Sequence, residues 1–481
     1  MAVGLLGNYD CMKILFICDW DYTLLWKKVA ETMLERKIID ECSALIIGRL
    51  YYENLKNENH IFKKLFLLQD FVEDMPKNID SVDDKIKKLE KKYNQHNIWK
   101  YVWADRSWIK STHEEIKLRL IITFNFFENF LQKEMPDLIV TNAYASMPHL
   151  ILNEVSNHKK IKIIRPLSTR LKDYYFLSET ALENEKWLIN FDKTKSLSKN
   201  RLKEVKKFLY DYRNNYEQPA YQEAQKHLYN FDINNFFRFF RYFYRFYISK
   251  VYDDHSKKSP FIKAYNELHW RIKRYYFKNI FFWDRQKNDD DYIYFPLHVQ
   301  PEMSTMVYAR FYLNQISVIE NLSKSIPVSY KIYVKEHPSM IGRRKKEYYD
   351  QIKILPNVKL IDPFIDSKNI IKNSRLIFTI TSTVGLEGLI LKKPVVALGS
   401  IYWKFCPLVF DAEEIPPTKW HDLIVKALKY KYREDILEKF LSEVLFNSFR
   451  GRYMEPLIDE KGILNIENIN NLILQIKKLY T

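Results

Sequence analysis

A regular alternation of strand-like and helix-like segments between Asp291 and Ser400 limits the possible folds of this chain more than any other feature. Short apolar runs, YIYFP, KIYV, VKLI, LIFTI and PVVAL, are separated by stretches that read as one helix each. Segments that alternate in this way form a parallel sheet covered by helices. The pattern predicts a doubly wound, Rossmann-like domain over residues 289–425, in which PEMSTMVYARFYLNQISVIENLSKS reads as one helix.

The start of the chain shows the same rhythm. The run KILFIC is followed by an acidic loop and a helix-like segment, and PDLIVTN and KIKIIRPL read as further strands. We expect a second Rossmann-like domain over residues 12–176, whose first segment, MKILFICDW, reads like a natural start. No apolar run reaches the roughly 18 residues of a spanning helix, and the first residues lack a signal-peptide pattern. A cytoplasmic protein is therefore expected.

Strand signals vanish between residues 177 and 288, where we expect a basic and aromatic helical insert; residues 426–481 read as C-terminal helices. In FFRFFRYFYRFY, three arginines share one helical face: Arg238, Arg241 and Arg245. Two interpretations stay open. The helix packs with its rings in the core, or it rests on the inner membrane face, where rings suit the headgroup region and cations attract anionic lipid.

Composition excludes several function classes. The chain has only 9 glycines in 481 residues and contains neither GxGxxG nor GxxxxGK[ST], which argues against a P-loop enzyme or a dinucleotide-binding dehydrogenase. Its four cysteines have no CxxC spacing, so no structural zinc site is expected. A net charge of +17 favours an anionic partner: nucleic acid, an acidic membrane or a phosphorylated substrate.

Polar side chains gather where the predicted strands of residues 289–425 end. In a parallel sheet, ligands bind at this carboxyl edge. Hydroxyl residues that open a helix form a phosphate site, because free N–H groups and the helix dipole point toward the anion. The residues concerned are His298, Glu302, Lys335, His337, Pro338, Ser382, Thr383, Gly385 and Glu387. Together they predict a nucleotide-sugar pocket, while Arg343 and Arg344 are expected on a solvated face.

The motifs YFPLHVQPE, YVKEHP and TITSTVGLEGLILKKPVVALG, in this order, resemble capsule and surface-polysaccharide glycosyltransferases of the Kdo-transferase type. That family implies the GT-B architecture, two Rossmann-like domains facing a cleft. Similar histidine-proline and hydroxyl motifs hold CMP in bacterial GT-B sialyltransferases. The resemblance extends from about Tyr292 to Ser400, is weak over the first domain and is absent from the helical insert.

By this resemblance, His337 and the Ser382–Thr383 pair contact the CMP phosphate, and Glu387 holds the nucleotide. The implied reaction transfers an acidic sugar, Kdo or a nonulosonic acid, from a CMP-activated donor to a cell-surface glycan. The expected partners are a nucleotide sugar, a glycan or lipid-linked glycan acceptor and the inner-membrane surface, with no nucleic acid. No cofactor and no metal are expected, because GT-B enzymes generally work without a bound metal.

An inverting reaction needs a base for the acceptor hydroxyl. Asp19 and Asp21 follow the first strand of the first domain and are the first candidates, with His298 and Glu302 as the next. Arg165 and Arg170, beyond the strand KIKII, are candidates for binding an acidic substrate.

Other functions remain open from the sequence. Glu387 would serve a UDP- or GDP-sugar transferase equally well, and sugar-nucleotide epimerases share the two-domain fold. A nucleic-acid-binding protein would explain the charge and the aromatic residues, but no RRM, KH or zinc-finger signature supports it.

Overall fold

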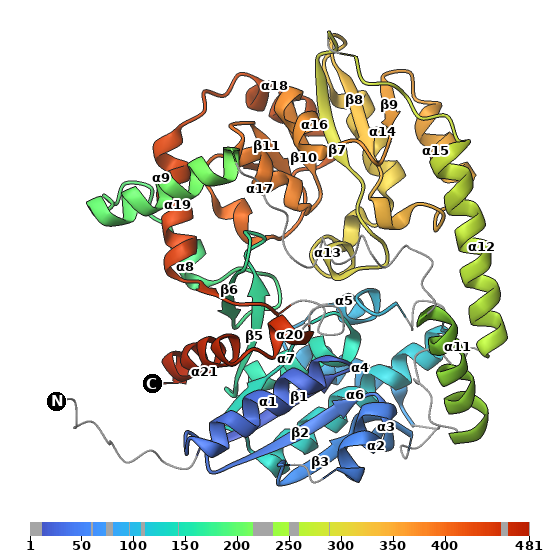
Figure 1. Cartoon of the computed structure of the whole chain (residues 1–481), viewed down its shortest axis with the longest axis vertical. Coiled ribbons are helices and arrows are strands. Elements are labelled where there is room, and N and C mark those ends of the chain that lie inside the picture. The colour runs from blue at the N-terminus through green and yellow to red at the C-terminus, as the bar shows by residue number, and fades with distance from the viewer. Residues whose placement is uncertain are drawn as a thin grey trace. The chain divides into compact units, whose positions relative to one another are not determined.

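The computed structural model forms two compact units, and the chain passes between them more than once (Figure 1). Unit 1 comprises Met1–Ala181, Gln218–Pro260 and Asn447–Thr481, and unit 2 comprises Leu182–Glu217 and Phe261–Phe446. The structure describes residues 12–58, 61–73, 80–95, 97–106, 111–142, 144–214, 234–249, 259–287, 289–453 and 460–480.

Unit 1 is built on a seven-stranded sheet in the order β13-β6-β5-β4-β1-β2-β3. The five strands from β5 to β3 are parallel, whereas β6 and β13 pair antiparallel at one side. Its strands are β1 (Lys13–Asp19), β2 (Glu41–Ile47), β3 (Lys64–Leu67), β4 (Leu138–Val140), β5 (Lys162–Ser168), β6 (Tyr174–Ser178) and β13 (Phe449–Arg450).

The helices of unit 1 cover this sheet. The longest, α6, begins with a capping box in which Thr112 and Glu115 satisfy each other's backbone N–H groups. The helices are α1 (Tyr22–Glu35), α2 (Arg49–Asn57), α3 (Leu68–Glu73), α4 (Val82–Lys92), α5 (Trp99–Trp103), α6 (His113–Glu134), α7 (Met147–His158), α11 (Asn234–Tyr244) with a π-helical turn at Arg245–Ser249, α20 (Glu460–Ile463) and α21 (Ile466–Tyr480).

The core of unit 1 combines both ends of the chain. Phe16 of β1 and Trp26 of α1 are fully buried in the same cluster as Ile473 of α21. Tyr453, which precedes α21, lies 6.0 Å from Trp26 between ring centroids and contacts Tyr175 of β6. The final helix is therefore part of the first core.

Unit 2 contains a six-stranded, wholly parallel sheet in the order β12-β11-β10-β7-β8-β9. Apart from the edge strand β12, its strands are almost entirely buried, as expected for a sheet covered on both faces. They are β7 (Tyr292–Pro296), β8 (Lys331–Lys335), β9 (Val358–Ile361), β10 (Leu376–Thr379), β11 (Val395–Ala397) and β12 (Val409–Asp411). The sheet of unit 2 is wholly parallel and that of unit 1 mainly parallel, and with their helices they confirm the predicted pair of Rossmann-like domains.

The α-helices of unit 2 are α8 (Lys186–Ile189), α9 (Lys199–Asn214), α12 (Pro260–Asn279), α13 (Met303–Met306), α14 (Gln315–Ser325), α15 (Lys346–Lys353), α16 (Ser367–Asn373), α17 (Thr383–Ile390), α18 (Trp420–Leu428) and α19 (Glu434–Phe446). In the part of unit 2 that the structure describes, short 3₁₀ turns lie at Arg310–Tyr312, Pro338–Met340, Tyr402–Phe405 and Pro417–Lys419.

The single helix predicted over residues 301–325 is wrong. The segment divides into α13, a 3₁₀ turn and α14. Asn314 ends the irregular part, because its side chain accepts the backbone N–H of Ser317 and so caps a new helix. The break lets the chain turn at the carboxyl end of β7, next to the candidate site.

The helix predicted for FFRFFRYFYRFY is confirmed as α11 and the π-helical turn after it. Phe240 and Tyr244 are each more than half exposed, so not all of its rings lie in a core. The side chains of Arg238 and Arg245 fall outside the described residues. Among the helices that the structure describes, none is long and apolar enough to cross a membrane. The expected domain limits at 176, 288 and 425 stay a prediction.

Candidate functional site

The carboxyl edge of the unit 2 sheet has its reversal point between β7 and β10. From β7 the chain builds β8 and β9 on one side and then returns to add β10 on the other. In such sheets the loops diverge at this point and open a crevice for a ligand. The structure brings the loops after β7, β8 and β10 to this edge, and they carry His298, His337 and Thr381.

Lys335 is the last residue of β8 and is buried, at 6% exposed. Its Nζ donates to the hydroxyl of Ser367, at the start of α16, over 2.8 Å. Burial lowers the pKa of Lys335 to about 8, although Asp366, Glu387 and Asp362 favour its charged form. An ammonium held at a strand end in this way can neutralise an anion that enters the crevice.

His337 begins the 3₁₀ turn that follows β8. Its Nδ1 accepts the backbone N–H of Ser339 over 3.3 Å and lies 2.7 Å from the Ser339 hydroxyl. Although His337 is exposed to solvent, desolvation of its ring by the surrounding protein and the charge of Lys335 lower the pKa of His337 to about 4. A neutral ring whose Nδ1 accepts must carry its proton on Nε2. Nε2–H is thus a donor for a phosphate oxygen.

Glu336 and Arg344 form a buried ion pair beneath this turn. Arg344 Nε lies 2.7 Å from Glu336 Oε2, with side chains 8% and 0% exposed. The other carboxylate oxygen of Glu336 accepts the backbone N–H of His337 over 2.8 Å, and Tyr349 donates to Oε2 over 3.1 Å. The expectation that Arg344 lies on a solvated face is wrong, because its partner arrives from the end of β8.

His298 connects the loops after β7 and β10. Its Nε2 accepts the backbone N–H of Thr381 over 3.0 Å, and its carbonyl accepts from Arg344 over 2.6 Å. Gln315 holds the His298 backbone with two further bonds, at 2.7 and 3.1 Å. Burial, reinforced by His337 and Arg344, lowers the pKa of His298 to about 3. Since Nε2 is already an acceptor for Thr381, the geometry gives His298 a positioning role; the predicted catalytic role stays untested.

The hydroxyl motif opens α17 as predicted. Ser382 is the N-cap, and its hydroxyl accepts the N–H of Val384 over 3.2 Å. Its own N–H donates to the Thr379 hydroxyl over 3.2 Å. Thr383 is the first helical residue and is partly exposed. Ser382 therefore caps the helix, while Thr383 offers a hydroxyl at the same helix N-terminus.

Gly385 and Glu387 lie farther along α17. A Cβ on Gly385 would meet the ring of Trp403 at 2.3 Å, so this glycine allows a buried tryptophan to pack against the helix. Glu387 is partly exposed and acts electrostatically on Lys335. Glu302 is exposed at the N-cap of α13, where its carboxylate accepts from Ser304 over 2.9 Å. Pro338 directs its carbonyl to Arg274 of α12, which donates over 2.8 Å.

Unit 1 has its own reversal point, between β1 and β4, and Asp19 ends β1 there. His149, in the first turn of α7, places Nε2 3.7 Å from Asp19 Oδ2. Its Nδ1 lies 2.7 Å from the hydroxyl of Ser146. No sequence motif indicated His149, although it follows the predicted strand PDLIVTN within one loop. Asp21 instead binds the hydroxyl of Tyr51.

Arg165 and Arg170 make mainly internal contacts in unit 1. Arg165 is 1% exposed, its guanidinium lies 4.6 Å from the centroid of the Tyr144 ring, and it donates to the carbonyl of Thr180 over 3.2 Å. Arg170 is half-buried and donates to the carbonyl of Ser168 over 3.1 Å. These contacts favour a structural role for Arg165; the substrate role of both residues stays a prediction.

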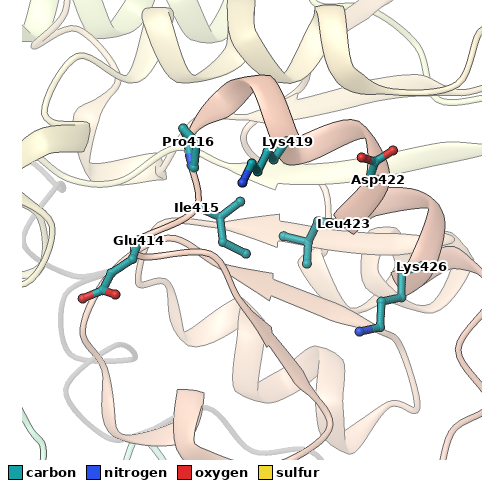
Figure 2. Close-up of a pocket in the computed structure, with 7 residues that line it drawn as sticks. All are labelled: Glu414, Ile415, Pro416, Lys419, Asp422, Leu423 and Lys426. Atoms are coloured by element: carbon teal, nitrogen blue, oxygen red, sulfur yellow. The ribbon is translucent and has the colours of Figure 1, made fainter.

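A surface pocket of about 410 Å³ follows the edge strand β12 and runs along α18. Figure 2 shows its lining residues, Glu414, Ile415, Pro416, Lys419, Asp422, Leu423 and Lys426. None of the predicted site residues lines it, and its charges are mixed. Across the described ranges, no cluster of three or more His, Cys, Asp or Glu side chains could hold a metal ion.

Comparison with known proteins agrees with the sequence motifs. Residues 203–422 match the family described as capsule polysaccharide biosynthesis protein, and this segment contains every predicted site residue of unit 2. The resemblance to capsule polysaccharide enzymes is thereby confirmed over these residues. Protein FixF of Sinorhizobium fredii (strain NBRC 101917 / NGR234) is 26% identical over 174 residues, which cover 34% of this chain and 40% of FixF.

Similar solved structures are 10–16% identical to this chain. The β-Kdo 2,7-transferase KpsC of Thermosulfurimonas dismutans is 14% identical, with a TM-score of 0.34, covering 77% of this chain and 98% of its own. The β-Kdo 2,4-transferase KpsC of the same organism is 12% identical, with a TM-score of 0.39, covering 69% of this chain and 88% of its own. The UDP-GlcNAc 2-epimerase of Methanocaldococcus jannaschii, in complex with UDP-GlcNAc and UDP, is 15% identical. Its TM-score is 0.30, and the match covers 90% of this chain and 99% of the epimerase.

Proposed function

We propose that this protein is a GT-B glycosyltransferase that transfers an acidic sugar, Kdo or a nonulosonic acid, from a CMP-activated donor to a cell-surface glycan. The observation that carries the proposal is the group of hydrogen-bond donors and positive charge at the reversal point of the unit 2 sheet. His337 Nε2–H, the Lys335 ammonium and the N-terminus of α17 are all groups that bind phosphate. The capsule family match over residues 203–422 supports the same reaction class.

The proposed chemistry separates into two tasks. In unit 2, His337 and Lys335 stabilise the negative charge that develops on the phosphate of the departing nucleotide. Such oriented donors act most strongly on charge that appears in the transition state. In unit 1, Asp19 removes the proton of the acceptor hydroxyl if the reaction inverts, and His149 beside it orients the carboxylate. Neither task requires a metal ion.

The proposed CMP-sugar transferase differs from the alternative functions in the nucleotide base that it binds. Glu387 would also serve a UDP- or GDP-sugar transferase or a sugar-nucleotide epimerase, so the contacts in unit 2 do not by themselves select cytidine. A thermal-unfolding series with CMP, UDP and GDP separates these possibilities, because only a bound nucleotide raises the melting temperature. We expect CMP alone to stabilise the protein. Stabilisation by UDP or GDP alone would show that the sugar donor carries that nucleotide and not CMP.

Two variants test whether the nucleotide binds at the proposed site. Thr383→Val removes a hydroxyl at the N-terminus of α17 and leaves the Ser382 cap in place, so the unliganded melting temperature should not change. CMP affinity, measured by calorimetry, should fall several-fold. Lys419→Ala, in the pocket beside α18, is the control and should leave affinity unchanged. The reverse result would move the nucleotide to that pocket.

A further inference from the structure

Helix α12 has two faces with different tasks. One face packs on unit 2: Phe277 is 2% exposed, and its ring centroid lies 5.1 Å from that of Tyr349 in α15. On the same face, the Trp270 indole donates to the carbonyl of Ile341 over 3.0 Å. Figure 1 shows α12 as a long yellow-green helix beside α15. These contacts fix the helix on unit 2 and determine which side faces outward.

The outward face carries four large apolar side chains in a row. Tyr265, Leu268, Ile272 and Tyr275 are 66%, 59%, 60% and 65% exposed. Their spacing of 3, 4 and 3 residues puts them on one line along the helix, opposite Trp270 and Phe277. We call these four residues the α12 stripe. Apolar side chains that gather in this way on a protein surface mark a contact with a partner or a membrane.

The charges of α12 identify the partner. Residues 260–279 contain five cations, Lys263, Arg271, Lys273, Arg274 and Lys278, and a single acid, Glu267. Arg274 donates to the Pro338 carbonyl on the packed face, and helical spacing places Arg271, Lys273 and Lys278 beside the stripe. Glu267 is paired with Arg271, at 2.9 Å. A second copy of α12 would bring the same positive charges against these. An anionic lipid surface is complementary to both features, because its interface accepts aromatic and aliphatic side chains and its headgroups attract Lys and Arg.

We propose that the α12 stripe docks on an anionic membrane surface. The same helix also holds the candidate donor site, since Arg274 donates to the carbonyl of Pro338 in the turn that begins at His337. Docking therefore brings this turn to within about one helix diameter, ~10 Å, of the lipid. Docking would give the transferase access to an acceptor that is anchored in lipid, and this benefit rests on the proposed function.

Flotation of the full chain with vesicles tests the proposal without any need for activity. We expect the protein to float with phosphatidylcholine–phosphatidylglycerol vesicles at low salt, and to stay behind with phosphatidylcholine alone or at high salt, because salt screens exposed charges. The double variant Leu268→Glu/Ile272→Glu should weaken partitioning roughly a hundredfold, because it removes two aliphatic side chains that the lipid would bury. Lys273→Glu/Lys278→Glu, which keeps the apolar stripe, should weaken it at least roughly fivefold per charge.

The control is Val328→Glu/Leu474→Glu, which adds the same charge at two exposed aliphatic positions outside α12. It should float like the unmodified protein. Failure to float with anionic vesicles at low salt, or equal loss in the control, overturns the proposal. Light scattering that shows a dimer, dissociated by Leu268→Glu/Ile272→Glu, would assign the stripe to a second copy instead. CMP affinity of the stripe variant should be unchanged, so a failure of the proposed function is recognised separately.

Discussion

The Nε atom of Arg344 lies 2.7 Å from Oε2 of Glu336, and neither side chain is more than 8% exposed. The pair links two loops of the candidate site, because Glu336 accepts the N–H of His337 while Arg344 donates to the carbonyl of His298. A buried charge without its counter-charge is strongly destabilising. The position of the His337 turn therefore depends on an ion pair that is itself almost completely buried.

Glu336→Leu should lower the free energy of unfolding by about 3–5 kcal/mol, since it leaves the Arg344 charge buried and unpaired. The double variant Glu336→Leu/Arg344→Met should lose less than the sum of the two single variants. Urea denaturation of all three measures the coupling. Simple additivity would mean that the two side chains do not interact.

Stability should also depend on His298. Burial lowers the pKa of its imidazole to about 3 in the folded protein, against an unfolded value near 6.5. Between these values the unfolded chain binds more protons, so stability falls as the pH is lowered. From pH 6.5 to pH 5 this group should account for about 2 kcal/mol. Urea denaturation at several pH values gives the free energy of unfolding of His298→Gln and of the unmodified protein. The difference between the two pH profiles is the contribution of His298. Parallel profiles would contradict the prediction.

His337→Ala should reduce transfer by roughly 10²–10³-fold, the usual effect of removing one donor to developing charge. His337→Gln should retain part of this activity, because its amide N–H replaces that of Nε2. Both variants should unfold at the same temperature as the unmodified protein, which is the control. Turnover close to normal in His337→Ala would exclude the residue from catalysis.

Nucleotide binding should weaken above pH 8. The pKa of Lys335 is lowered by burial to about 8, so its ammonium loses its proton as the pH rises through this value. If that charge binds phosphate, CMP affinity should fall by up to about tenfold per pH unit above the pKa of the free protein. Lys335→Met should bind more weakly at pH 7 and show no such decline. Calorimetry at pH 7 and pH 9 compares the two, and an equal decline in both would implicate another group.

The acceptor base should be Asp19 and not Asp21. Asp19 has His149 beside it, whereas Asp21 binds the Tyr51 hydroxyl. Asp19→Asn should lower turnover by roughly 10²–10⁴-fold with unchanged CMP affinity, and Asp21→Asn should have a much smaller effect. His149→Gln should reduce turnover and shift its pH profile. Full activity in Asp19→Asn would place the base elsewhere.

Much of the fold could be predicted because parallel strands are buried on both faces and read as continuous apolar runs. KILFIC, YIYFP and KIYV were recognised in this way, and the polar residues after them fell at the correct sheet edge. The strands β3, β6, β12 and β13 were not recognised. β13 has only two residues, Phe449 and Arg450, and two residues show no periodicity.

The contacts between loops could not be predicted, because they depend on the pairing of distant segments. Arg344 and His298 are 46 residues apart, and only the adjacency of β7 and β8 brings them together. The sequence around Arg344 shows two arginines and two lysines, which is typical of a solvated face. For the same reason, nothing near Asp19 indicates that His149 lies beside it.

The return of α21 to the first core affects how the protein is made. Ile473 and Ile476 are buried in the cluster that holds Trp26 of α1, so this core lacks part of its apolar surface until α21 has left the ribosome. A nascent chain grows by about 5–20 residues per second, which delays closure of unit 1 by tens of seconds. Both segments of unit 2, Leu182–Glu217 and Phe261–Phe446, emerge before that moment. The unit that is begun first is therefore completed last during synthesis.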